Sequence, residues 1–123
     1  MPTIKRFEEI EAWQDSRQLV KTIYKHTRSG HFGKDFILRD QIRRASISIM
    51  ANIAEGFERK GDVEFRRFLY IAKASAGEVR SLIYVAFDLG YFDTEIYESL
   101  MDKVTDLSSK IAAFIKYLDA EST

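Results

Sequence analysis

A row of polar side chains recurs at helical spacing in the middle of the sequence. It combines amide, cationic, hydroxyl and acidic groups and consists of Gln41, Arg44, Ser48, Asn52 and Glu55. A carboxylate held among arginines occurs in active sites, where it serves as a general acid or base. No nucleophile or histidine accompanies Glu55, and an arginine partner keeps a carboxylate ionised instead of poised near neutral pH. The row therefore predicts a structural network and not an active site.

This network is expected to continue on the following segment, at Arg67, Ser75 and Glu78. If the two segments pair as antiparallel helices, Arg44 faces Glu78 and Glu55 faces Arg67, which makes two candidate ion pairs. Such pairs fix the register of the helices more than they stabilise the fold, because desolvation offsets much of the Coulomb attraction. The predicted structural network comprises Arg44, Ser48, Asn52, Glu55, Arg67, Ser75 and Glu78.

Other catalytic or ligand-binding motifs are incomplete. His26 and His31 are the two histidines, and neither lies in an HExxH or ExxH pattern. The segment 29–35 is similar to a phosphate-binding loop at Gly33 and Lys34, but it lacks the glycine spacing and the Ser or Thr of that loop. The sequence has no cysteine, which excludes disulfides and thiolate metal sites. We expect no enzyme activity, no cofactor and no metal.

Basic residues suggest a second class of function. Seven positive charges fall within the 29 positions from Arg39 to Arg67, and several follow an acid by four residues, which favours a salt-bridged surface. The alternative is a surface that contacts phosphates. The candidate nucleic-acid-binding residues are Arg39, Arg43, Arg59, Lys60 and Arg66.

The formal net charge is zero, but the charge is unevenly distributed. Residues 1–60 carry twelve basic and eight acidic side chains, net +4, whereas residues 92–123 carry three basic and seven acidic ones, net −4. The zero sum excludes a uniformly basic protein. The two oppositely charged ends could bind each other across a bundle or a subunit boundary, or leave one face open to an anionic partner.

Four helices are expected to position these residues. One proline and six glycines give little punctuation for strands, and the glycines separate segments with a repeat of three to four residues. The predicted helices span about residues 8–29, 34–58, 62–89 and 93–119, and short loops join them into an antiparallel up-down-up-down four-helix bundle. The 123 residues, of which 46% are hydrophobic, are expected to form a single domain over residues 1–123.

The second and third predicted helices carry more apolar and small residues than one core-facing stripe requires. Gly77 costs about 1 kcal/mol inside a helix, so we expect it to allow a close approach between these two helices. The additional apolar residues indicate either a wide core or, as we interpret them, an interface between subunits. The predicted interface comprises Ile47, Met50, Ala54, Phe57, Phe68, Ile71, Leu82 and Val85.

The segment from Leu38 to Val79 resembles the four-helix bundle proteins known as ribosomal RNA intervening-sequence proteins. Matching features are Ala45 and Ser48 after an arginine, NIAEG at residues 52–56, and FxRFLxxAxxSxxE at residues 65–78. The aromatic start at Phe7 and the LGY sequence at residues 89–91 match as well, so the resemblance covers nearly the whole chain.

This resemblance implies an antiparallel four-helix bundle that assembles as a ring-like homopentamer. Some members of the family are encoded within insertions in the large-subunit ribosomal RNA gene. Related bundles are accessory proteins of diversity-generating retroelements, which associate with nucleic acid and reverse transcriptase. Those relatives use a strongly basic surface, whereas the charges of this chain sum to zero.

We therefore expect a non-enzymatic, homo-oligomeric helical-bundle module for assembly or binding. RNA binding through a basic surface of the oligomer is the alternative, and a nucleic-acid-processing protein is a further candidate partner. No segment has the apolar length of a signal peptide or a membrane span, so we expect a cytoplasmic protein without a membrane partner.

Overall fold

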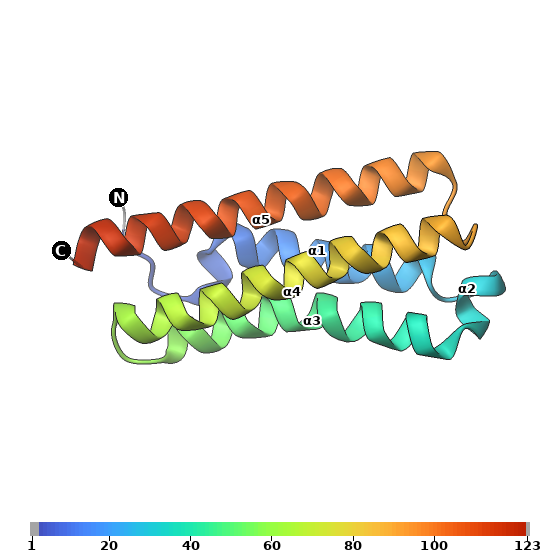
Figure 1. The fold of residues 1–123 in the computed structure, drawn as a ribbon. Helices are drawn as coiled ribbons and strands as arrows, with labels where there is room; N and C mark the ends of the chain where they lie inside the picture. The colour runs from blue at the N-terminus through green and yellow to red at the C-terminus, as the bar shows by residue number, and fades with distance from the viewer. Residues whose placement is uncertain (1–2, 123) are drawn as a thin grey trace.

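Four long helices and two short helical segments make up the protein in a computed structural model that describes residues 3–122 (Figure 1). The long helices are α1 (Glu11–His26), α3 (Phe36–Glu58), α4 (Asp62–Asp88) and α5 (Thr94–Ser122), and the short segments are η1 (Phe7–Glu9) and α2 (Gly30–Lys34). The described residues contain no strand. Successive long helices run in opposite directions, so the predicted all-helical bundle is confirmed.

The main departure from the predicted boundaries is α2, which occupies the expected loop between the first two long helices. Gly30 starts it with a φ of 68°, a conformation that glycine adopts without strain. Asp35 ends it and begins α3, because its Oδ1 accepts a hydrogen bond from Leu38 N at 3.1 Å. The α4–α5 turn is fixed to this end of the bundle, since the Tyr91 hydroxyl donates to Asp35 Oδ2 at 2.9 Å.

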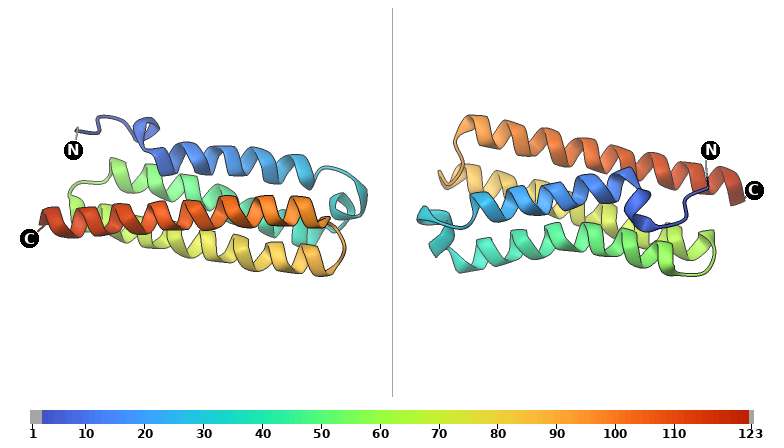
Figure 2. Two further views of the ribbon diagram at one scale, coloured as in Figure 1. Left: turned by 90° about the horizontal axis from the view of Figure 1, so that it is seen from above. Right: turned by 180° about the vertical axis from the view of Figure 1, so that it is seen from behind.

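The four long helices surround one hydrophobic core. α3 packs against α1 and α4, and α5 packs against the same two helices. α1 and α4 therefore lie on opposite sides of the bundle (Figure 2). Buried residues, most of them aliphatic, recur every three or four positions along each long helix, as the spacing predicts. None of the helices within residues 3–122 combines the length and hydrophobicity needed to cross a lipid bilayer.

α3 and α4 form the closest pair, and Gly56 is the point where they meet. A Cβ on Gly56 would lie 2.6 Å from Phe68 Cβ and 3.1 Å from Phe65 Cδ1. Ala72 and Ala76 line the same side of α4 and are completely buried. The prediction for Gly77 is wrong, because this residue is exposed and an added Cβ would meet no atom within 4 Å.

α1 and α5 are joined by Lys110. Its Nζ lies 2.8 Å from Glu11 Oε1, 2.5 Å from Asp15 Oδ2 and 3.3 Å from Asp106 Oδ2. The hydrogen bonds to Asp15 and Glu11 raise the pKa of Lys110 above its usual range. In this contact the acids come from residues 1–60, whose net charge is +4, and the lysine comes from residues 92–123, whose net charge is −4. The local charges are therefore opposite in sign to the net charges of the two segments.

We expect Gly56→Ala to destabilise the fold by about 1–3 kcal/mol, because its methyl group forces α3 and α4 apart. Gly77→Ala is the matched control and should raise the unfolding free energy by up to about 1 kcal/mol, since the new Cβ is unobstructed. Urea unfolding followed by circular dichroism, at one protein concentration, measures both. Equal effects of the two substitutions would contradict the close approach at Gly56.

We expect Lys110→Met to lower the unfolding free energy at pH 7 by no more than about 1 kcal/mol, because the ion pairs are partly exposed. A raised pKa stabilises the fold below the unfolded lysine value of about 10.4, and this contribution is lost as the pH rises through the folded value. The difference between wild type and variant should therefore begin to close only above a pH of about 10.4.

Lys103→Met, also on α5, is the control for this prediction, and it should leave stability within about 0.5 kcal/mol at every pH. A difference between wild type and Lys110→Met that stays constant through the alkaline range would argue against the three-carboxylate contact.

Candidate functional site

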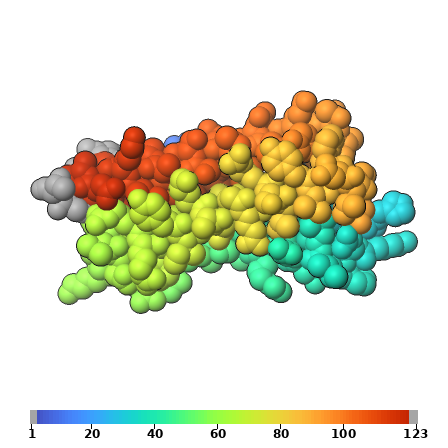
Figure 3. Space-filling view, in the orientation of Figure 1, coloured from blue at the N-terminus to red at the C-terminus, as the bar shows by residue number. Residues whose placement is uncertain are grey.

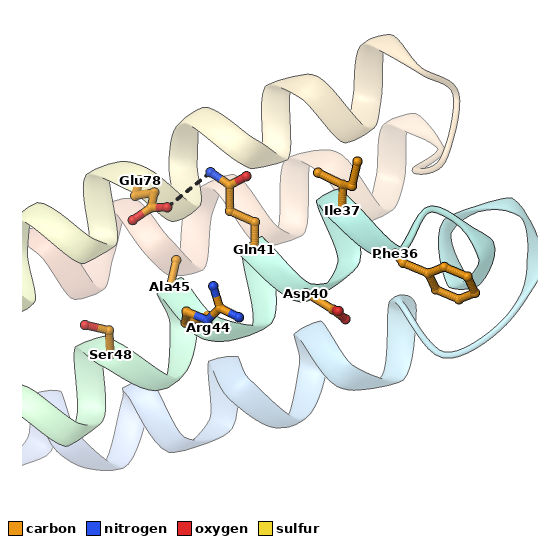
Figure 4. Close-up of a pocket in the computed structure, with 8 residues that line it drawn as sticks. All are labelled: Phe36, Ile37, Asp40, Gln41, Arg44, Ala45, Ser48 and Glu78. Atoms are coloured by element: carbon orange, nitrogen blue, oxygen red, sulfur yellow. Dashed lines mark hydrogen bonds between the residues drawn. The ribbon is translucent and has the colours of Figure 1, made fainter.

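A groove lies on the outside of α3 and α4, between one row of side chains on each helix. The α3 row contains Ile37, Gln41, Arg44, Ser48 and Asn52. The α4 row contains Ile71, Ser75, Glu78 and Val85 on the same side of the helix, together with Leu82, which is buried. Each row keeps a spacing of three or four residues, which places its members on one side of a helix. The groove encloses about 660 Å³ and is lined by Phe36, Ile37, Asp40, Gln41, Arg44, Ala45, Ser48 and Glu78 (Figure 4).

Hydrogen bonds join α3 and α4 at one end of this groove. Ser48 Oγ and Ser75 Oγ lie 2.8 Å apart, and Asn52 Nδ2 donates to Ser48 O at 2.8 Å and to Ser48 Oγ at 3.0 Å. These three residues of the predicted network are therefore brought together. They fix the register of the two helices, because a shift by one turn would separate the two hydroxyls.

The two predicted ion pairs do not form. Gln41, not Arg44, reaches Glu78, with Nε2 3.4 Å from Oε2 (Figure 4). Among the described residues, neither Arg44 nor Glu78 has an ion-pair partner. Both charges consequently remain available on the walls of an open groove.

Glu55 and Arg67 form pairs along their own helices instead. Arg59 Nη2 lies 2.9 Å from Glu55 Oε1, and Arg67 Nε lies 2.9 Å from Glu64 Oε2. The hydrogen bond from Arg67 lowers the pKa of Glu64. Neighbours three or four positions apart meet on a helix without any change in the helix packing, so these local pairs replace the predicted pair between helices.

Exposed apolar side chains lie in the groove and near it. Ile37, at the start of α3, lines the groove and is 83% exposed. Ile71 and Val85 are also exposed and lie two turns on either side of Glu78, on the same side of α4. Arg44 and Asp40 also line a second hollow on the α1 side of α3, together with Tyr24, Arg43 and Ile47. α3 is thus a ridge between two hollows, and Ile37, Arg44 and Ile47 lie along it.

The predicted interface residues divide into three groups. Ile47, Ile71 and Val85 are exposed, whereas Met50, Ala54 and Phe57 are half-buried. Phe68 and Leu82 are only 6% and 8% exposed, so they belong to the interior of the protomer and not to its accessible surface.

The burial of Phe68 follows from the glycine opposite it. The missing side chain of Gly56 leaves room for Phe68, and the guanidinium groups of Arg59 and Arg67 cover its ring at 5.0 and 4.6 Å. Ile37 and Phe36 were not predicted as surface residues of interest, although Ile37 lies seven positions before Arg44 and shares its side of α3.

The five predicted nucleic-acid-binding residues do not form one patch on a protomer. About 30 Å of helix separates Arg39 from Arg59, at a rise of 1.5 Å per residue. Arg39 donates to Gly33 O at 3.2 Å, and Arg43 donates to Thr27 Oγ1 at 2.9 Å. Arg66 Nε lies 3.0 Å from Asp119 Oδ1, Arg59 is paired with Glu55, and Lys60 is exposed after the end of α3.

No group of three or more His, Asp or Glu side chains within the described part of the chain has an arrangement that could hold a metal ion. The chemistry that the groove does offer is an unpaired guanidinium, an unpaired carboxylate and exposed apolar side chains. These groups are suited to binding another protein surface.

Comparison with known proteins shows two similarities. The model of the family described as 23S rRNA-intervening sequence protein matches residues 8–113, a range that includes all of α3 and α4. The crystal structure of a protein with unknown function from the S23 ribosomal protein family of Bacteroides thetaiotaomicron superposes with a TM-score of 0.78. The two chains are 25% identical, and the alignment covers 85% of this chain and 95% of that one. No curated protein matches the sequence.

Proposed function

The chain belongs to the 23S rRNA-intervening sequence protein family, and from this premise we propose that it is a non-enzymatic module that assembles as a ring-like homopentamer through the α3–α4 groove. The supporting observation is that Arg44 and Glu78 lie on the walls of one open groove and have no ion-pair partner among the residues that the structure describes. In the proposed assembly, Arg44 of one copy pairs with Glu78 of the next copy. Arg44 of that next copy then pairs with Glu78 of a third, and so on around the ring.

Exposed apolar residues give this assembly its driving force. Ile37 and Ile47 lie on the α3 ridge, and Ile71 and Val85 are exposed on the side of α4 that carries Glu78. Burial of such side chains stabilises an interface by about 25 cal/mol for each Å² of apolar surface. The charged pair at the centre contributes the specificity of the docking, since a wrongly placed copy leaves both charges unpaired in an apolar surrounding.

The two partners in this contact use different surfaces. The ridge of α3, with Arg44 and Ile47, docks onto the α4 side of the next groove, with Glu78 and Val85. Such a heterologous contact leaves the same pair of surfaces free on the outer sides of both copies, so copies are added until a ring closes. The number five is the one implied by the family resemblance.

RNA binding is the second candidate function. The five predicted cations lie apart on a protomer, so a basic surface built from them would exist only where neighbouring protomers bring them together. RNA binding through these five cations therefore depends on the ring, so an experiment on it is informative only once the assembly has been established.

Light scattering on the purified protein should give a mass five times the 14.3 kDa of the chain. Val85→Glu should yield a 14.3 kDa species with unchanged helical circular dichroism, because it places a second carboxylate two turns from Glu78 on the side of α4 that the proposed interface covers. Val63→Glu is the matched control, since Val63 is exposed on the same helix but belongs to neither row, and it should keep the wild-type mass. A wild-type mass of a single chain would overturn the proposal.

A further inference from the structure

The side of α4 that faces α5 carries a row of different chemistry from the side that faces α3. Its members alternate between cations and tyrosines around one glycine and are spaced by four, three, four, three and four residues: Arg66, Tyr70, Lys73, Gly77, Arg80 and Tyr84. We call this row the cation–tyrosine stripe. Its orientation toward α5 follows from the Arg66–Asp119 ion pair and from the contact of the Tyr84 and Tyr97 rings, whose centroids are 5.9 Å apart.

The stripe is open to solvent. Tyr70 is 57% exposed and Tyr84 is 46% exposed, so each offers much of a ring surface. Figure 3 shows the face of the molecule on which α4 runs between α5 and α3, with surface accessible along both flanks. The stripe lies on the α5 flank, away from the groove of Arg44 and Glu78.

A hollow of about 630 Å³ accompanies the stripe between α4 and α5. It is lined by Tyr70 and Lys73 of α4 and by Ser109, Ala112, Ala113, Ile115, Lys116 and Asp119 of α5. Asp119 is the one carboxylate among these lining residues, and Arg66 binds it at 3.0 Å. Lys73 and Lys116 have no ion-pair partner among the described residues. The hollow is therefore locally positive, although residues 92–123 carry a net charge of −4.

Gly77, at the centre of the stripe, has no role in the packing of the protomer. An added Cβ would meet no atom within 4 Å, yet glycine costs about 1 kcal/mol in the interior of a helix. A glycine that internal packing does not require permits another backbone to approach the helix closely. The space left by the absent side chain of Gly77 lies between Lys73 and Arg80. A ligand that contacts both cations therefore passes directly over Gly77.

We propose that the cation–tyrosine stripe binds a single-stranded nucleic acid. Lys73, Arg80 and Lys116 contact its phosphates, the rings of Tyr70 and Tyr84 stack on its bases, and its backbone passes over Gly77. Tyr70 and Tyr84 are about 21 Å apart along the helix, which leaves room for several nucleotides between them. Cationic grooves with exposed aromatic rings are the usual means of binding single strands without base-specific hydrogen bonds.

An acidic peptide is a different class of partner, and the chemistry of the stripe favours it less. Glutamate side chains would use the cations but would leave the two exposed tyrosine rings without a planar group to stack on. All residues of the stripe lie in one protomer, so the proposed binding of a single-stranded nucleic acid does not require the proposed ring.

Fluorescence anisotropy with a labelled 20-nucleotide oligouridine tests the proposal. Wild type should bind it at low salt, and Lys73→Gln/Arg80→Gln should weaken binding at least tenfold. The slope of log affinity against log salt should fall by about 1.4 in this variant, which is 0.7 for each lost phosphate contact to a single strand. Lys21→Gln/Lys25→Gln on α1 is the matched control, with the same loss of charge, and should change affinity less than twofold.

Two further variants test base stacking on Tyr70 and the close approach at Gly77, neither of which is needed for binding by charge alone. Tyr70→Leu, which keeps an apolar side chain but removes the stacking surface, should weaken binding at least about fivefold. Gly77→Leu fills the gap and should weaken binding similarly while the helix content and the mass by light scattering stay as in wild type. These readouts separate a failure of nucleic-acid binding from a failure of the proposed assembly.

Two comparison probes identify the ligand class. Labelled oligothymidine of equal length should also bind, because the stripe makes no contact that distinguishes RNA from DNA. Labelled polyglutamate of equal charge should bind at least tenfold more weakly. Equal binding of polyglutamate, an unchanged affinity of Tyr70→Leu, or no binding of oligouridine by the wild type would each overturn the proposal.

Discussion

At Gly56, α3 comes so close to α4 that one methyl group would lie 2.6 Å from the Cβ of Phe68. This contact requires α3 and α4 to approach closely at the end of the pair that is next to their connecting turn. It leaves room for Phe68 to be buried in the protomer, and two turns further along α3 the hydroxyls of Ser48 and Ser75 lie 2.8 Å apart. With the space between the helices filled by small and apolar side chains, Arg44 and Glu78 are left at the outer edge, in a groove that stays open.

The surfaces of α4 follow from the same packing. Its core-facing side is occupied by buried residues such as Leu69, Ala72 and Val79, so its remaining chemistry is divided between two flanks. The flank toward α3 carries a carboxylate and apolar residues, which suit another protein surface. The flank toward α5 carries cations and tyrosines, which suit a single strand of nucleic acid. One helix thereby offers two surfaces that do not share side chains, so the proposed assembly and the proposed nucleic-acid binding are compatible with each other.

The helices could be predicted from the sequence because heptad spacing of apolar residues depends only on local periodicity. The positions of long-range partners could not. An antiparallel register known to within one turn allows either Gln41 or Arg44 to reach Glu78, and the structure selects Gln41. The expected partners of Glu55 and Arg67 failed for a related reason, since local neighbours compete with distant ones. Spacing also does not reveal which glycine touches another helix, so the sequence predicts a close approach at Gly77 whereas the structure places it at Gly56.

The central claim is that Arg44 of one copy pairs with Glu78 of the next. Light scattering of three variants, Arg44→Glu, Glu78→Arg and the double exchange, tests it most directly. Each single variant places like charges across the interface and should dissociate toward the 14.3 kDa chain, whereas the double exchange restores opposite charges and should recover the mass of the wild-type assembly. Single variants that keep the wild-type mass, or a double exchange that stays dissociated, would contradict the account.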